Sequence, residues 1–191
     1  MLTVLVIDES KARAGEICAG LALAGYQVAA ILAGADNLTA EVEKLQPDVI
    51  LIDTDSPSRD TLEHLAAMNK DMPRPVVIFT QEDGQETIRD AVKAGVSAYI
   101  VDGLDPKRIK PIVEVARARF EDTQALRREL DEISQKLSDR KLVDKAKGVL
   151  MKARGLDEDA AYHAMRKLAM ERGQSMAKVA RDVIDMARVL L

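Results

Sequence analysis

The run Val49-Ile50-Leu51-Ile52-Asp53 decides the fold, because four consecutive large aliphatic residues end abruptly in a carboxylate. A short apolar run of this kind is typical of a strand that is buried on both faces of a sheet. Four similar runs occur before residue 102, and helical segments separate them; they cover residues 2–7, 27–32, 75–80 and 98–101. Strands that alternate with helices in this way predict a doubly wound parallel sheet of five strands.

Polar side chains stand where these predicted strands end. Asp8 and Glu9 follow the first strand, Asp53 ends the third, Thr80 ends the fourth, and Asp102 follows the fifth. Because doubly wound sheets bind ligands at the carboxyl ends of their strands, we expect these side chains to form one pocket. Carboxylates that converge repel one another unless a cation lies among them, and oxygen ligands suit Mg²⁺. For any single acid, helix capping or a solvated loop is the alternative interpretation.

This acidic pocket predicts a particular chemistry. Asp8, Glu9 and Asp53 are the expected metal ligands, and Asp53, at the end of the central strand, is the candidate to accept a phosphoryl group. An enzyme is not expected, because the two histidines, His64 and His163, stand alone on helical segments without a paired nucleophile.

Charge divides the chain of 191 residues into an acidic front and a basic back. Residues 1–111 carry a net charge of -7, residues 112–137 carry -1, and residues 138–191 carry +4. This division fits a regulator joined to a polyanion-binding tail, although ordinary surface charge can also produce it.

No segment reaches the ~18 apolar residues of a membrane span, and no signal peptide is recognisable. With Cys18 as the one cysteine, expected in the core, these features predict a cytoplasmic protein.

A long helix is expected to begin at Asp105-Pro106, and residues 112–147 contain neither glycine nor proline. Within it, residues 112–137 form a linker whose apolar side chains repeat at spacings of four, three and four; they are Leu126, Leu130, Ile133 and Leu137. This spacing predicts a short coiled-coil seam. Since an apolar stripe with no core to cover needs a partner, we expect a homodimer. The alternative is a linker helix that packs on its own domain.

Residues 140–154 predict an amphipathic helix with basic flanks, and two shorter helices follow to complete a small all-helical domain over residues 138–191. Gly148 and Met151 face outward between the flanks. A glycine inside a helix costs about 1 kcal/mol relative to alanine, which favours a site where another molecule approaches the backbone. The splayed bases of an RNA loop suit such a face. An ordinary solvated helix and a DNA contact are the alternatives, but the tail shows no helix-turn-helix spacing.

Residues 1–111 resemble the receiver domain of two-component response regulators. Asp8-Glu9 match the acidic pair of that family, Asp53 matches the phospho-acceptor, Thr80 the switch hydroxyl and Tyr99 the switch aromatic. The resemblance implies a flavodoxin-like fold with these residues in those roles.

One departure from the receiver pattern affects the expected signal. The pattern has a lysine after the fifth strand, where this chain reads Val101-Asp102-Gly103. A lysine would neutralise the phosphoryl charge, whereas an acid adds a negative charge. We therefore expect phosphorylation of Asp53 to be weak or absent as the physiological signal.

Residues 138–191 resemble the ANTAR domain, a three-helix RNA-binding antiterminator module. The resemblance rests on motifs along the whole segment: Ala146-Lys147-Gly148-Val149-Leu150-Met151, Ala161-Tyr162, Met165-Arg166 and Val179-Ala180. The residues that we expect at the RNA are Arg140, Lys141, Lys145, Ala146, Lys147, Gly148, Met151, Tyr162 and Arg166. Tyr162 has an alternative role as a core residue whose hydroxyl reaches the surface.

As a whole, the chain resembles the nitrate/nitrite-assimilation antiterminators. This resemblance implies binding to hairpin loops of a leader mRNA, which prevents a terminator hairpin from forming. It also implies control by a nitrate-sensing partner that resembles solute-binding proteins. Two other functions stay open: a phosphorylation-dependent DNA-binding response regulator, and an adaptor that contacts no nucleic acid.

Overall fold

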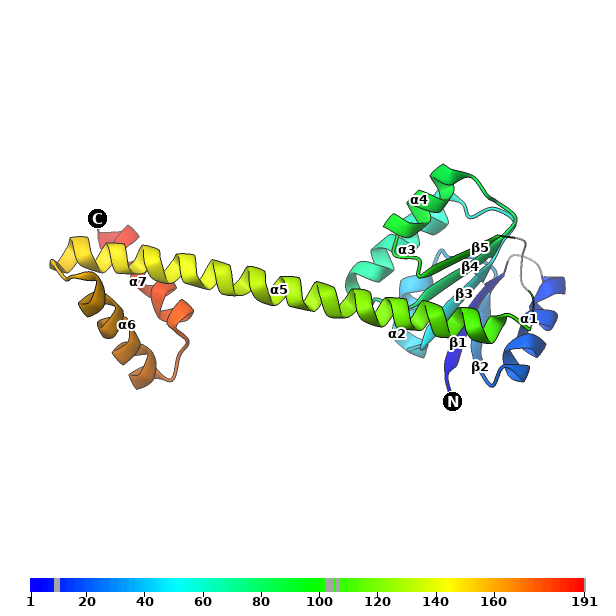
Figure 1. The fold of residues 1–191 in the computed structure, drawn as a ribbon, viewed down its shortest axis with the longest axis horizontal. Helices are drawn as coiled ribbons and strands as arrows, with labels where there is room; N and C mark the ends of the chain where they lie inside the picture. The colour runs from blue at the N-terminus through cyan, green and yellow to red at the C-terminus, as the bar shows by residue number, and fades with distance from the viewer. Residues whose placement is uncertain (9–10, 102–104, 106, 191) are drawn as a thin grey trace. The chain divides into compact units, whose positions relative to one another are not determined.

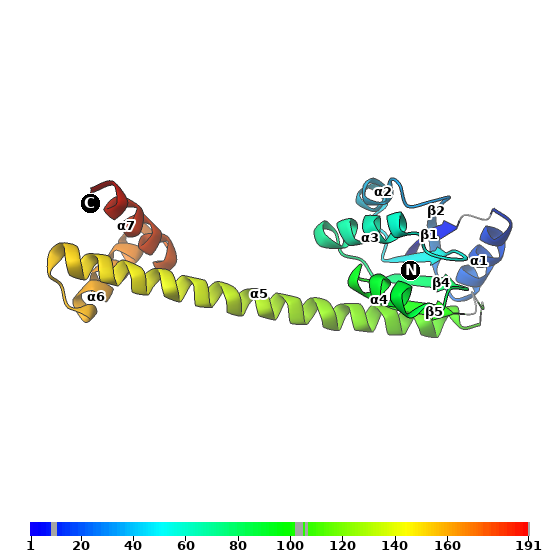
Figure 2. The same ribbon diagram turned by 90° about the horizontal axis from the view of Figure 1, so that it is seen from above.

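The computed structural model describes residues 1–8, 11–101, 105 and 107–190. It divides into two compact units, Met1–Gln124 and Ala125–Leu191, whose elements are shown from two sides in Figures 1 and 2. The strands and helices of the first unit are β1 (Thr3–Asp8), α1 (Lys11–Leu23), β2 (Gln27–Leu32), α2 (Leu38–Leu45), β3 (Val49–Asp53), α3 (Arg59–Asp71), β4 (Val76–Thr80), α4 (Gln85–Lys93) and β5 (Ala98–Val101). The long helix α5 (Ile109–Arg154) begins in the first unit and ends in the second, which also holds α6 (Glu158–Arg172) and α7 (Met176–Leu190).

The five strands form one parallel sheet in the order β2-β1-β3-β4-β5, which confirms the doubly wound fold that the sequence predicts. Every residue of the central strand β3 is buried. From β1 the chain first passes to β2, which pairs with one edge of β1, and β3 later pairs with the other edge. The carboxyl ends of β1 and β3 are therefore the point at which sheets of this kind bind ligands.

Two apolar clusters cover the two faces of the sheet. Because successive side chains of a strand point to opposite faces, Leu5 and Ile50 join the cluster with α2, α3 and α4, whereas Val6 and Leu51 join the cluster with α1 and α5. In Figure 2 the helices α2, α3 and α4 lie along one face of the strands. The sheet is thus buried on both faces, as its continuous apolar strands require.

The first turns of α5 belong to the core of the first unit. Ile109, Val113 and Ala116 are fully buried against the sheet. One turn into the helix, Glu114 Oε1 accepts a hydrogen bond from the Tyr26 hydroxyl at 3.1 Å, which ties α5 to the segment between α1 and β2. The start of the long helix is therefore part of the core of the first unit.

Two details differ from the sequence-based expectations. Cys18 is half buried on α1, at the margin of the core and not within it. The helix α5 begins at Ile109, later than expected, because a turn precedes it in which the Asp105 carbonyl accepts a hydrogen bond from the Arg108 amide at 2.9 Å.

The second unit is a three-helix arrangement in which the end of α5 packs with α6 and α7. Its core is made of apolar side chains, three of them alanines: Ala146, Met165, Ala169, Val179, Ala180 and Ile184. Asp157 caps α6 by accepting a hydrogen bond from the Ala160 amide at 2.7 Å, and Gly173 ends the helix with a positive φ of 61°. The linker and the first helix of the tail are one continuous helix in this structure. None of the helices among the described residues combines the length and apolarity needed to cross a membrane.

Candidate functional site

The acidic pocket is built from the ends of two neighbouring strands. Asp8 and Asp53 are register partners at the ends of β1 and β3, and their exposed fractions are 3% and 6%. Of the other acids that the sequence assigns to this pocket, Glu9 and Asp102 lie outside the described residues. Within the described ranges, no group of three or more potential metal-binding side chains is present. Asp8 and Asp53 are thus the two described members of the predicted set of three ligands.

The two expected switch residues are tied to the same loop. Thr80 Oγ1 donates a hydrogen bond to the Asp55 carbonyl at 2.9 Å and accepts one from the Glu82 amide at 3.1 Å. The Tyr99 hydroxyl donates a hydrogen bond to the Glu82 carbonyl at 3.0 Å, and burial raises the pKa of this tyrosine. Thr80 and Tyr99 therefore share Glu82, so a shift of the Thr80 hydroxyl would disturb the segment that holds Tyr99.

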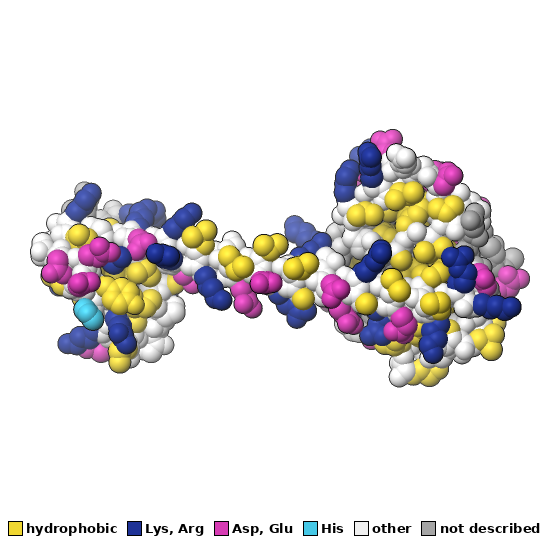
Figure 3. All heavy atoms as spheres, in the orientation of Figure 1, with side chains coloured by type: hydrophobic (Ala, Val, Ile, Leu, Met, Phe, Trp, Pro, Cys, Tyr) yellow, Lys and Arg dark blue, Asp and Glu magenta, His cyan; other side chains and the backbone are white. Residues whose placement is uncertain are grey.

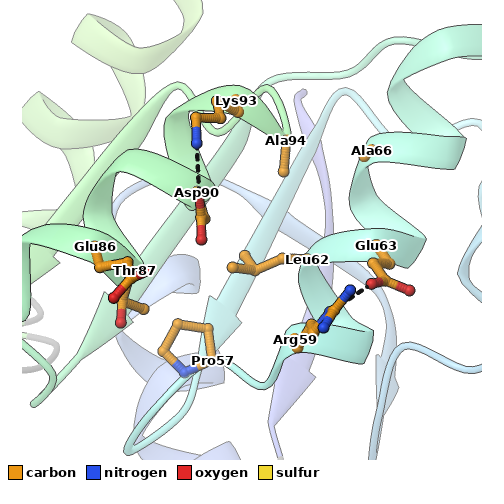
Figure 4. Close-up of a pocket in the computed structure, with 10 residues that line it drawn as sticks. All are labelled: Pro57, Arg59, Leu62, Glu63, Ala66, Glu86, Thr87, Asp90, Lys93 and Ala94. Carbon is orange, nitrogen blue, oxygen red and sulfur yellow. Dashed lines mark hydrogen bonds and ion pairs between the residues drawn. The ribbon is translucent and has the colours of Figure 1, made fainter.

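A groove of about 590 Å³ separates α3 from α4 in the first unit (Figure 4). On its α3 side, Arg59 Nε pairs with Glu63 Oε1 at 2.8 Å, and on its α4 side, Lys93 Nζ pairs with Asp90 Oδ1 at 2.8 Å. Both ion pairs are exposed and are formed within one helix, as is common on helix surfaces. Four of the five charged side chains at this groove are thus paired within their own helix, Glu86 being the fifth, and we assign the groove no ligand.

The middle of α5 exposes the predicted coiled-coil seam. Leu126, Leu130, Ile133 and Leu137 have exposed fractions between 54% and 66%. Figure 3 shows hydrophobic side chains at intervals along this part of the helix, between charged ones. Four large aliphatic side chains in one stripe are unusual on a solvated helix, so the stripe is a candidate contact surface.

The basic face of α5 is open in the way that its sequence predicts. Arg140, Lys141 and Lys145 are exposed, and Met151 is 38% exposed. A Cβ atom added to Gly148 would meet none of the described atoms within 4 Å. The glycine is therefore not required by packing inside the unit.

Two residues of the same motif are placed differently from the expectation that they contact RNA. Ala146 is fully buried in the core of the second unit, so its side chain is unavailable to RNA and the expected contact is corrected to a packing role. Lys147 lies at the edge of the face, with only 16% of its side chain exposed, and Nζ pairs with Asp144 Oδ1 at 2.8 Å and with Glu158 Oε1 at 2.7 Å. The motif thus contains residues that pack in the core of the second unit as well as residues that are exposed on its surface.

The helix α6 adds a second exposed row. Tyr162 is 41% exposed, so the structure favours the surface position for its ring over the core position, and Arg166, one turn further, is exposed as well. The Tyr162 ring meets His163 edge-on, with centroids 6.2 Å apart. Both expected residues of α6 are therefore accessible.

The outer surface of α6 also displays residues that the sequence-based prediction missed. A shallow groove of about 360 Å³ is lined by the predicted Arg166 and by four residues that were not predicted: His163, Lys167, Met170 and Glu171. Of these, Met170 is 74% exposed. Helical periodicity could have identified these exposed positions, because they lie on the side of α6 opposite Ala161, Met165 and Ala169, which face the core.

Comparison with known proteins identifies both units. Residues 4–114 match the family model of the response regulator receiver domain, and residues 131–184 match that of the ANTAR domain. The chain is 29% identical over 161 residues to the transcriptional regulatory protein PdtaR of Mycobacterium tuberculosis (strain ATCC 25618 / H37Rv), which covers 84% of this chain and 78% of that protein. It is 36% identical over 75 residues to the nitrate regulatory protein of Klebsiella oxytoca, which covers 39% of this chain and 19% of that protein.

The solved structures show the fold of the first unit alone. A CheY-like response regulator receiver domain protein of Methanospirillum hungatei JF-1 matches with a TM-score of 0.56 at 22% identity, over 64% of this chain and 98% of that one. The likeness agrees with the strand order of the sheet and adds no statement about ligands.

Proposed function

Because the chain belongs to the response regulators, with a receiver domain followed by an ANTAR domain, we propose that it is an RNA-binding transcription antiterminator. The second unit would bind hairpin loops in a leader mRNA, and this binding would prevent a terminator hairpin from forming. The observation that carries the proposal is the open basic face of α5 at Gly148, together with the exposed Tyr162 and Arg166 of α6.

The exposed side chains divide into two kinds of contact. Arg140, Lys141 and Lys145 offer positive charges to the phosphates, which supply affinity without sequence preference. Gly148 and Met151 leave room for a close approach to the helix. Tyr162 offers a stacking surface, and Arg166 can stack on a base and donate paired hydrogen bonds to it. Loop recognition is thus assigned mainly to Gly148 and the row on α6.

Replacing Gly148 by alanine separates its structural effect from its functional one. In the open helical position, the added methyl group should raise the free energy of unfolding by about 1 kcal/mol, because alanine is the better helix former. If RNA approaches the backbone here, the methyl group should instead lower the affinity for hairpin RNA about five- to one-hundredfold, as overpacking does elsewhere. Thermal unfolding and RNA titration measure the two effects.

The matched control is Gly15→Ala. Gly15 is likewise a helical glycine with none of the described atoms within 4 Å of an added Cβ, but it lies on α1 of the first unit. This variant should be stabilised and should bind RNA like the unaltered chain. A Gly148→Ala protein that binds RNA with undiminished affinity would remove the backbone approach at Gly148 from the proposal.

We further propose that the chain acts as a homodimer through the seam formed by Leu126, Leu130, Ile133 and Leu137. The support is the exposure of all four side chains in one stripe at coiled-coil spacing. A dimer presents two RNA-binding units, so that one leader with two loops is bound more tightly than either loop alone.

We also propose a specific signal for this antiterminator, namely nitrate, which acts through a partner protein. The support is the similarity to the nitrate regulatory protein, together with an acid at residue 102 where receivers have a lysine. A sensor partner that resembles solute-binding proteins would hold the regulator and release it when nitrate is present.

Receiver domains bind Mg²⁺ in an acidic site, and the residues of this pocket fit that ion. Asp8 and Asp53 are two buried carboxylates at adjacent strand ends, a donor set that hard cations prefer, and Glu9 follows Asp8 directly in the sequence. We propose that these three residues hold the ion, which would offset the negative charge of a phosphoryl group near Asp53.

Incubation with Mg²⁺ and a small phosphodonor should modify only a small fraction of the chain. The reason is that Asp102 adds negative charge where a lysine would neutralise the phosphoryl group. Intact-mass measurement reports the fraction directly. Asp102→Lys should raise the modified fraction severalfold, and Asp53→Asn should abolish it. If the unaltered chain is modified efficiently and Asp53→Asn is not, phosphorylation of Asp53 is an effective signal. That result would contradict the proposal that a partner controls the protein in place of phosphorylation.

The experiment that tests the proposed function compares a hairpin-bearing leader RNA with duplex DNA of equal length over a salt series. Every polyanion binder loses affinity as salt rises, so the comparison must be made at each salt concentration. We expect a preference for the hairpin RNA that persists at high salt. Equal affinity for the two would reject the RNA-specific function, and preference for DNA would favour the DNA-binding response regulator.

A further inference from the structure

Two rows of side chains on the second unit are joined at one ion pair. Residues four positions apart lie one above the other on a helix, so one row on α5 runs from Lys147 to Met151. On α6 the corresponding row runs from Glu158 through Tyr162 to Arg166. Lys147 Nζ donates a hydrogen bond to Glu158 Oε1 at 2.7 Å, which links the two rows at their first members.

Lys147 is committed to protein contacts. Its ammonium group also pairs with Asp144 Oδ1 at 2.8 Å, so two of its three N–H groups have carboxylate acceptors. Its side chain is 16% exposed, whereas those of Asp144 and Glu158 are 55% and 68% exposed, which means that its aliphatic stem is covered by protein. The hydrogen bonds to Asp144 and then Glu158 raise the pKa of Lys147 above its usual value.

We propose that Lys147 is a positioning residue, which fixes the start of α6 against α5 and so aligns Tyr162 and Arg166 with the basic face, and that it does not bind RNA phosphate itself. The inference rests on the proposed RNA-binding function. An ordinary surface ion pair within one helix contributes little. This one has two carboxylate partners and connects two helices across the turn at Gly155, whose φ is +65°. The ion pair therefore helps to fix the rotation of α6 about its own axis relative to α5, as the packing of the buried Ala161 also does.

Glu158→Gln distinguishes the two roles, because they predict opposite signs. If Lys147 contacts phosphate, removing the negative charge of Glu158 frees the lysine and should leave the affinity for hairpin RNA unchanged or higher. If Lys147 positions α6, the same variant should lower the affinity about three- to thirtyfold, within the range of coupling between contacting residues. The matched control is Asp185→Asn, the corresponding change of a carboxylate to its amide on α7, where the side chain is 70% exposed and pairs with Arg188 at 3.7 Å. It should not lower the affinity.

The salt dependence of Lys147→Gln supplies a second readout. A lost phosphate contact reduces the slope of log affinity against log salt by about 0.7 to 0.9, whereas a positioning residue leaves the slope unchanged. We expect an unchanged slope, a loss similar to that of Glu158→Gln, and no further loss in the double variant. A reduced slope, or a Glu158→Gln protein that binds as well as the unaltered chain, would overturn the inference while leaving the proposed function intact.

A measurement without RNA keeps the inference testable should the proposed function fail. If the unaltered chain does not bind hairpin RNA, hydrogen exchange of the amides in the first two turns of α6 still reports on the ion pair. Lys147→Gln and Glu158→Gln should each speed this exchange by a similar factor, and the double variant should be no faster than either. Exchange at the rate of the unaltered chain in all three variants would reject the positioning role.

Discussion

Replacing both Leu130 and Ile133 by glutamate is expected to convert the protein from a dimer to a monomer. The two side chains are 66% and 54% exposed and stand at successive positions of the seam. Burying a large aliphatic side chain contributes about 1.5–3 kcal/mol, and a dimer would bury four from these two positions. Four carboxylates at the same places would repel one another in a closed seam. We expect the dimer to weaken at least about a thousandfold, which sedimentation over a concentration series would measure.

The same variant should lose RNA affinity without losing its folded units. Glutamate is a good helix former, so α5 should persist. If two loops of one leader are bound by one dimer, monomers lose the gain from linkage, and the affinity for a two-hairpin RNA should fall by roughly 10²-fold or more. The affinity for an RNA with one hairpin should change little. This difference separates loss of the dimer from damage to the RNA-binding surface.

A charge-matched control makes the result specific to the seam. Arg128→Gln combined with Gln135→Glu changes the net charge by -2, as the seam variant does, but these positions are seven residues apart on the side of the helix opposite the seam. The control should remain dimeric. If the unaltered chain sediments as a monomer at every concentration, the proposed dimer is rejected. If the control variant also dissociates, the dissociation of the seam variant is explained by general charge repulsion and not by loss of the seam.

The fold could be predicted because it follows from local patterns. Runs such as residues 49–53 are too apolar to lie anywhere but inside a sheet, and their alternation with helices leaves few arrangements. The convergence of Asp8 and Asp53 could be predicted for the same reason, since parallel strands end at one edge. The basic, open face at Gly148 follows from helical periodicity alone.

The role of Lys147 could not be predicted in this way, because it depends on a contact between distant segments. Lys147 meets Glu158 across eleven residues, and that meeting depends on the turn at Gly155 and on the rotation of α6. Helical periodicity, in contrast, places Ala146 on the apolar side of α5 with Leu142 and Leu150, and only the family motif suggested that it contacts RNA. A resemblance to a family motif marks such residues as characteristic without saying whether they face the ligand or the core.

Arg166→Ala is expected to remove most of the preference for hairpin loops. The guanidinium group is exposed on α6, one turn beyond Tyr162, and it can both stack on a splayed base and donate two parallel hydrogen bonds. Losing such a contact typically costs about 1–3 kcal/mol, or roughly five- to one-hundred-and-fiftyfold in affinity. Arg166→Lys should recover only part of this loss, since lysine keeps the charge but not the planar donor pair. Titration of leader RNA and of a variant with altered loop bases would measure the preference.

The control removes the same charge from another helix of the same unit. Arg188 of α7 has a side chain that is 71% exposed, and its contact with Asp185 is long, at 3.7 Å. Arg188→Ala should weaken the binding of all RNAs slightly and equally, as the loss of one distant charge does. If the two alanine variants lose affinity to the same extent and keep the same loop preference, Arg166 contributes only general attraction. Base recognition would then have to be assigned to Tyr162 or to the residues that line the groove on α6, such as His163 and Met170.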